Sequence, residues 1–235
     1  MDETFDRQTD PPAAAPQSAA AGIPLEDLVP ILRGVSHVHS TYVAAVAGLV
    51  LIVIAPDATA RWCSAGYALA LVALFGVSGL LHRWRWDPRW QPTLRRLDHS
   101  TIFLFIGVCI TVLAIQVLSG PTQVVVLVLG WIGAIAGITL SVAWIDAPRW
   151  LATSTYVLVS LAAAIGLPQM LARLSIAPLV LVAVGGALYA VGAVVFATRL
   201  PDPCPRVFGF HEVFHAIVIA AAAIHFVALA GWILI

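Results

Sequence analysis

The chain has 235 residues, of which 61% are hydrophobic and 10% are charged, and its twelve basic and twelve acidic residues cancel. Soluble domains carry about 25% charged residues, so this composition excludes an ordinary soluble domain and indicates an integral membrane protein. A formal charge of zero provides no overall basic field that would attract nucleic acid. The cysteines Cys63, Cys109 and Cys204 are scattered without a CxxC spacing, which is typical of packing residues rather than of a disulfide framework.

The first thirty residues differ from the rest of the chain. They are rich in Ala, Pro, Gln and Ser, and they hold six acidic residues against the single Arg7. Such a composition cannot bury a core, so we predict a disordered tail over residues 1–30. The acidic start, without a basic region before an apolar run, argues against a cleaved signal peptide.

Seven apolar runs follow the tail, and each approaches the ~20 residues that a membrane span requires. Because lipid cannot satisfy backbone hydrogen bonds, these runs are expected to be helices. The connections are short, so residues 31–235 are predicted to form one all-α bundle of seven transmembrane helices. The expected spans lie near 35–55, 62–82, 99–118, 122–142, 150–171, 176–198 and 211–235.

The arginines are unevenly divided between the two sides of this bundle. Two of them, Arg61 and Arg173, fall on one side. Because basic residues collect in cytoplasmic loops, we expect a multi-pass protein of the plasma membrane with a cytoplasmic N-terminus and an external C-terminus. The ten arginines of the other side are Arg7, Arg33, Arg83, Arg85, Arg89, Arg95, Arg96, Arg149, Arg199 and Arg206.

Arginine and tryptophan alternate in the connection 83–96 after the second span. Tryptophan rings anchor in the headgroup layer, and arginine meets anionic phosphate there. The segment is therefore predicted to be a topology determinant and anchor. A specific site for anionic lipid headgroups is the sharper alternative.

Several ionisable residues are expected to share one depth near the cytoplasmic face. The second span ends at His82, the third begins just after Asp98, and the seventh begins at His211 and His215. Residues four apart on a helix share one face, which applies to His211 with His215 and to Ser78 with His82. Ionisable groups within a membrane are costly, so their convergence indicates a functional site.

The residue types in this layer suit a zinc centre. Three imidazoles, from His82, His211 and His215, can fill three of the four tetrahedral positions and leave the fourth for water. Asp98 could hold that water and accept its proton. Ser78 could orient His82 or donate to a substrate oxygen.

The other histidines are open to a simpler interpretation. His39 and His225 are expected to be interfacial or hydrogen-bonded residues, and His225 should lie about 15 Å further along the helix than His215. His37 and His99 either support the ligands from behind or are simple interface residues.

Three segments of the chain carry a resemblance to a known family. They are Ser78-Gly-Leu-Leu-His82, Arg95-Arg-Leu-Asp98-His-Ser-Thr-Ile and Phe208-Gly-Phe-His211-Glu-Val-Phe-His215. In order, spacing and helix placement they resemble the motif blocks of the hemolysin III proteins, the bacterial branch of the progestin and adiponectin receptor superfamily. The resemblance covers roughly residues 31–235.

The resemblance implies a function for these residues. In the adiponectin receptors the matching histidines bind one zinc ion, and the matching aspartate reaches it through water. By position, His82, His211 and His215 would be the ligands, with Asp98 and Ser78 in support. The superfamily also looks related to alkaline ceramidases, which suggests hydrolysis of a membrane lipid amide, and bacterial members are linked to membrane-lipid homeostasis.

One segment departs from the family pattern. Many members carry Glu and Asn upstream of a Thr-His or Ser-His pair, whereas here Pro30 and Arg33 precede Ser36-His37. Any role of that acidic residue is therefore not transferred to this chain.

Three functions are compatible with the sequence. A zinc-dependent hydrolase of a lipid amide or ester is favoured. A membrane sensor or regulator with a structural zinc ion is the alternative. A pore-forming cytolysin ranks last, because the four middle spans contain almost no charged residues that could line a water-filled path.

Overall fold

The computed structural model describes residues 29–235, so nearly all of the predicted tail 1–30 lies outside the described residues. Over the described part the chain is all-α, with seven helical segments long and apolar enough to cross a membrane. The predicted fold class is confirmed. The elements are α1 (Val35–Ile54), α2 (Ala58–Arg83), α3 (Gln91–Val117), α4 (Gly120–Ala143), α5 (Arg149–Ser160), η2 (Leu161–Gly166), α6 (Leu167–Arg173), α7 (Ile176–Thr198), α8 (Phe210–Ala228) and η3 (Leu229–Ile233).

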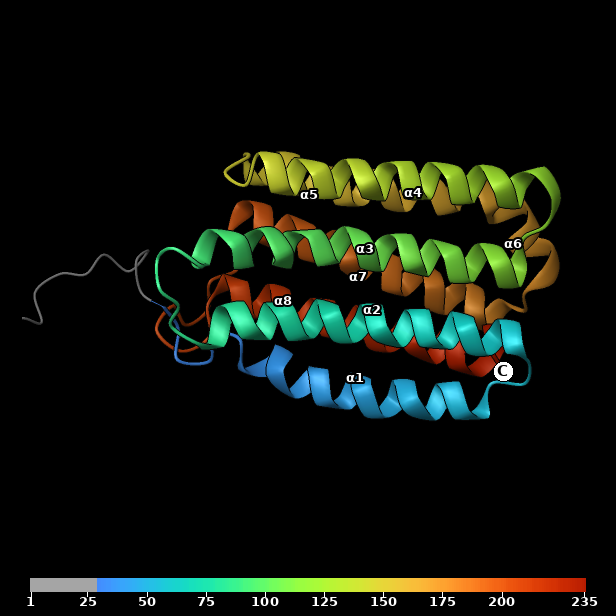
Figure 1. Cartoon of the computed structure of the whole chain (residues 1–235), viewed down its shortest axis with the longest axis horizontal. Coiled ribbons are helices and arrows are strands. Elements are labelled where there is room, and N and C mark those ends of the chain that lie inside the picture. Colours follow the sequence, from blue (N-terminus) through green and yellow to red (C-terminus); the bar gives the residue numbers. More distant parts are fainter. Residues whose placement is uncertain (1–28) are drawn as a thin grey trace, which may run out of the picture.

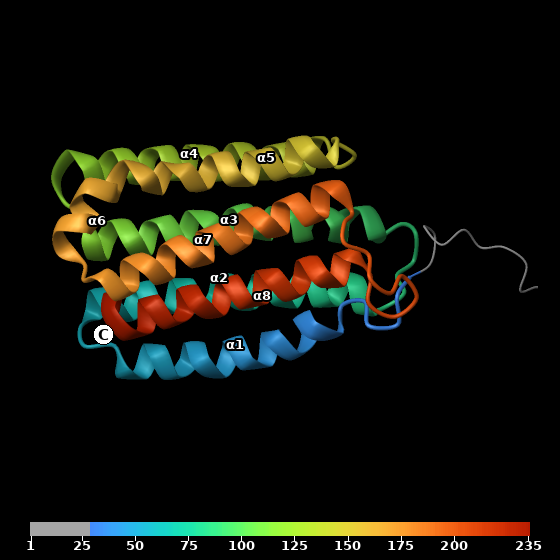
Figure 2. The same cartoon turned by 180° about the vertical axis from the view of Figure 1, so that it is seen from behind.

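The helices run up and down in a single bundle, and α1 begins at the end of the bundle opposite to the C-terminus (Figure 1). Helices α1 to α4 pack side by side in chain order, and α5, α7 and α8 cover them from behind (Figure 2). Since α8 also contacts α1, the chain closes into a ring of helices around a shared interior. The starts of α1, α3 and α8 and the end of α2 therefore meet at one end of the bundle.

The outer surface of the bundle is apolar, as a lipid solvent requires. On α1, Val46, Leu49 and Val53 are each more than 60% exposed, while Leu51 is only 1% exposed and packs inward. A water-soluble helix would place polar residues on the outward face. The exposed aliphatic side chains show that this face is matched to hydrocarbon, which agrees with a multi-pass membrane protein.

The predicted start of the third span is wrong. The connection 83–96 was expected to be a loop, but α3 begins at Gln91 and takes up its second half. Pro92 lies in the first turn of α3, where its missing N–H leaves no hydrogen bond unmade. The polar composition of residues 91–96 concealed two helical turns that extend beyond the apolar run.

The fifth span is not one continuous α-helix. The span predicted near 150–171 is confirmed as Arg149–Arg173, but it consists of α5, the 3₁₀ segment η2 and the short α6. Pro168 lies in the first turn of α6 and cannot donate the backbone hydrogen bond that would continue the preceding helix. The tighter 3₁₀ turns before it accommodate this missing bond.

Candidate metal centre

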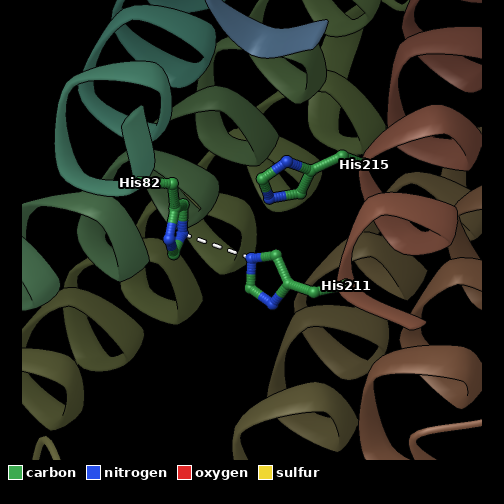
Figure 3. Close-up of side chains that lie close together, drawn as sticks. All are labelled: His82, His211 and His215. Atoms are coloured by element: carbon green, nitrogen blue, oxygen red, sulfur yellow. Dashed lines mark hydrogen bonds between the residues drawn. The ribbon is translucent and has the colours of Figure 1, made fainter. Parts of the chain in front are cut away.

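Three histidines from two helices meet in the interior of the bundle. His82 lies at the end of α2, and His211 and His215 lie one turn apart at the start of α8. Figure 3 shows the three rings facing one another, and each offers a nitrogen within 4.8 Å of the others. His215 is fully buried, at 1% exposed, and the other two are half-buried. The three histidines therefore lie close enough to hold one metal ion.

The donor set fits a small tetrahedral ion. The Nε2 atoms of His82 and His211 are 3.2 Å apart. Two nitrogens bound to one tetrahedral zinc at 2.0–2.1 Å are themselves about 3.3 Å apart, so this spacing matches two ligands of a shared ion. The Nδ1 atom of His215 is buried and has no hydrogen-bond partner within residues 29–235. The three imidazoles therefore have the spacing that a shared metal ion would require.

Asp98 lies next to the histidines, where the topology predicted it. Its Oδ2 atom is 3.5 Å from Nε2 of His82, the same nitrogen that faces His211. The carboxylate comes from the second turn of α3 and is largely buried, with its side chain 13% exposed. Asp98 therefore approaches the three histidines from a third helix.

Ser78 lies on the same wall, one turn before His82 on α2, and is 4% exposed. It lines the interior cavity together with His82 and Asp98. Within residues 29–235 its hydroxyl makes no hydrogen bond to the His82 ring, so the structure brings Ser78 to the site without joining it to that ligand.

The remaining histidines separate into supporting and distant residues. His37 is 3% exposed, and its ring stacks on that of His215 with centroids 3.7 Å apart and planes at 8°. His99 lines the same cavity. His39 is exposed, and His225 lies outside the cluster and contacts the backbone oxygen of Val182 at 3.1 Å. Of the two histidines left open by the sequence, His37 directly buttresses a candidate ligand.

The sequence analysis missed an ion pair beside the centre. Glu212 is 2% exposed and pairs with Arg33 at the start of the first helix. Its second carboxylate oxygen accepts a hydrogen bond from the N–H of Gly209 at 2.9 Å, which caps α8. Glu212 follows His211 directly, so this pair holds the first turn of α8 against the chain before α1. Two features of the sequence could have indicated this ion pair. Glu212 is an acidic residue within an apolar span, and Arg33 departs from the family pattern.

A close backbone contact positions His82 from the other side. Gly34 adopts a φ of 76°, and a Cβ atom at this position would lie 2.8 Å from the backbone N of Arg83. Only glycine accepts both the left-handed backbone and this approach. The start of α1 therefore lies directly on the last turn of α2 and fixes the residue that carries the candidate ligand.

The centre opens into a large cavity inside the bundle. The cavity has a volume of about 1450 Å³ and is lined by residues of α2, α3, α5, α7 and α8. It extends from the histidines to Leu229 and Ile233 at the end of the chain. At 1.5 Å per residue, His215 and Ile233 are about 27 Å apart along α8 and η3. The cavity therefore reaches from the polar centre through most of a hydrocarbon layer, which is about 30 Å thick.

The comparisons with known proteins agree with the family resemblance of the sequence. The sequence profile of the family described as haemolysin-III related matches residues 28–226, which is most of the chain. The chain belongs to this family. It is 27% identical to Hemolysin-3 of Bacillus cereus over 171 residues, covering 72% of this chain and 74% of that protein. It is 24% identical to a Hemolysin-3 homolog of Bacillus subtilis (strain 168) over 199 residues, covering 83% and 90%.

Proposed function

We propose that this haemolysin-III related protein is a zinc-dependent hydrolase of the plasma membrane that cleaves an amide or ester bond of a membrane lipid. The observation that carries the proposal is that three histidines able to hold one metal ion open into an apolar cavity about as deep as an acyl chain is long. A metal centre with only a structural role does not need such a cavity. The orientation predicted from the arginines places the reaction on the cytoplasmic side.

Each residue of the centre has a role in this proposal. His82, His211 and His215 would hold the ion. When bound, zinc supplies Lewis-acid polarisation of a carbonyl group and eases the deprotonation of water. Asp98, the carboxylate next to the His82 ring, would accept the proton from the attacking water and return it to the leaving group. Ser78 would donate a hydrogen bond to the carbonyl oxygen of the substrate.

The cavity supports a lipid as the substrate. Its deep wall is formed by aliphatic side chains, including Ile110, Leu113 and Leu229. Burying a hydrocarbon chain here would bind the substrate at about 0.8 kcal/mol per CH₂ group, leaving the polar bond at the histidines. Cleavage of such lipids would contribute to membrane-lipid homeostasis. The arginines and tryptophans of residues 83–96 would anchor this end of the bundle among anionic headgroups.

The test separates metal binding from catalysis. Purified wild-type protein and Asp98→Ala are assayed for zinc content and for turnover of a panel of lipid amides and esters. We expect Asp98→Ala to keep its zinc and to lose activity by about 10²–10⁴-fold, the usual contribution of a general base. Asp87→Ala is the control, because Asp87 pairs with Arg89 at an exposed position and does not line the cavity.

A second function is favoured by one observation, namely that the three histidines join α2 to α8. A zinc ion there would stabilise the bundle of a membrane sensor or regulator without any reaction. Wild-type protein that contains zinc but cleaves no lipid of the panel, together with Asp98→Ala of unchanged phenotype and His215→Ala that unfolds, would favour this second function over hydrolysis.

A further inference from the structure

An arginine lies on the rim of the cavity next to the candidate metal centre. Arg149 is the first residue of α5, and its guanidinium carbon is 5.6 Å from the ring centroid of Phe196 and 5.8 Å from that of Phe210. The same two rings pack against His211, with centroid distances of 5.8 and 6.1 Å. A single layer of aromatic side chains therefore separates Arg149 from a candidate zinc ligand.

Among residues 29–235, no acidic side chain forms an ion pair with Arg149. Its Nη1 atom is buried and has no hydrogen-bond partner among the described residues. The charged side chains that act on it are Arg199 and Arg95, which have the same sign. The described acidic side chains at this end of the bundle have other partners: His82–Asp98, Arg95–Asp146, Arg33–Glu212 and Arg89–Asp87 are pairs, and Asp202 accepts a hydrogen bond from the N–H of Phe210.

Such an arrangement is unfavourable unless an anion is bound. Arg149 is half-buried as a residue, but its Nη1 group is buried without a partner, so this N–H group loses its hydration and gains no hydrogen bond in return. An arginine that served only as a topology determinant would extend into water, as Arg89 does: its side chain is 75% exposed and pairs with Asp87. Arg149 lies instead over the two aromatic rings, and its Nη1 atom is buried. The planar fork of a guanidinium group binds carboxylate and phosphate groups with two parallel hydrogen bonds.

We propose that Arg149, with Arg199 beside it, binds the oxyanion of an anionic amphiphile whose hydrocarbon chain occupies the cavity. This inference rests on the proposed function and names its substrate class as lipids with a phosphate or carboxylate group near the bond that is cleaved. The anion would lie on the rim, the reacting bond at the histidines, and the chain against the aliphatic wall. Neutral amphiphiles would fill the cavity but leave Arg149 unpaired.

The test measures binding without chemistry. The thermal stability of the purified zinc-loaded protein in a nonionic detergent is followed while dodecyl phosphate, dodecanol or inorganic phosphate is added. The apparent dissociation constant is compared among wild type, Arg149→Gln, Arg149→Lys and Arg89→Gln. Arg89 is the matched control because it also lies over an aromatic ring, that of Trp90 at 6.0 Å, but outside the cavity. The zinc content of each variant is measured in parallel.

We expect dodecyl phosphate to bind wild type and Arg89→Gln equally, and Arg149→Gln at least about 10-fold more weakly, because a charge-assisted hydrogen bond is lost. Arg149→Lys should fall between them, since lysine keeps the charge but not the fork. Dodecanol should bind all four proteins equally. Zinc content should be the same throughout.

Equal binding of dodecyl phosphate to wild type and Arg149→Gln would overturn the proposal. Inorganic phosphate that protects as well as dodecyl phosphate would overturn the assignment to a lipid, because the chain would then contribute nothing. Failure of the proposed hydrolase is a separate result: it would appear as absent turnover in a protein that still binds dodecyl phosphate through Arg149. Conversely, hydrolysis of neutral lipids alone would keep the proposed function and overturn this inference.

Discussion

The two ends of α8 carry the same residue type in very different surroundings. At its start, His211 and His215 meet His82 of α2, and their ring nitrogens lie within 4.8 Å of one another. Near its end, His225 contacts the carbonyl oxygen of Val182 at 3.1 Å, and its ring packs against Tyr189 with centroids 5.4 Å apart. Both regions line the same cavity. One end gathers several imidazoles, whereas the other gives its single histidine an uncharged partner.

The neighbouring helices account for this difference. The start of α8 faces the end of α2 and the second turn of α3, and both supply ionisable groups, His82 and Asp98. The end of α8 faces apolar turns of α7, where the available polar partner of His225 is a backbone carbonyl. A histidine in a membrane helix therefore becomes a candidate ligand only where the opposite helices also present ionisable groups.

The largest expected effect is the loss of zinc affinity when a histidine at the start of α8 is replaced. His215→Ala should lower the affinity for zinc by more than about 100-fold, because loss of a ligand exceeds the 10–100-fold effect typical of residues behind the ligands. His225→Ala should leave it unchanged. Zinc affinity is measured by competition with a coloured chelator. Equal losses in the two variants would show that the cluster around His82 is not where the ion binds.

A second prediction concerns the ion pair that fixes the start of α8. Glu212→Ala should destabilise the protein by about 3 kcal/mol, because it leaves Arg33 without its carboxylate and removes the cap at Gly209. Unfolding by a denaturing detergent measures the change. Asp87→Ala, which breaks the exposed pair with Arg89, should cost less than about 1 kcal/mol. Similar costs for the two variants would mean that the Glu212 pair contributes no more than a surface contact.

The smallest expected effect is a loss of stability when His225, near the end of α8, is replaced. His225→Ala should destabilise the protein by about 1 kcal/mol through the lost hydrogen bond to Val182, without any change in zinc content. The same detergent titration measures this effect. If added zinc stabilised wild type more than His225→Ala, the two ends of α8 would be coupled. His225 would then not be independent of the candidate metal centre.

The number of spans and their positions could be read from the chain because lipid selects for apolar runs of one length. The misplaced start of α3 and the interrupted fifth span have a common reason. Helix ends depend on local backbone chemistry, such as the prolines Pro92 and Pro168, rather than on hydropathy. The sequence could also place His82, Asp98, His211 and His215 in one layer, because the up-and-down order of the helices determines the depth of each residue.

The depth of these residues in the membrane does not determine which of their side chains are in contact. The 3.2 Å approach of His82 to His211, the stacking of His37 on His215 and the pairing of Arg33 with Glu212 join residues up to 179 positions apart in the chain. They depend on how the helices rotate and close into a ring, which is set by the packing of all seven together. The sequence by itself determined the spans and the layer of ionisable residues, because both follow from the thickness of a membrane. Only the tertiary structure decided the partners within that layer and the cavity beneath it, since these require the side-chain packing of helices that are distant in sequence.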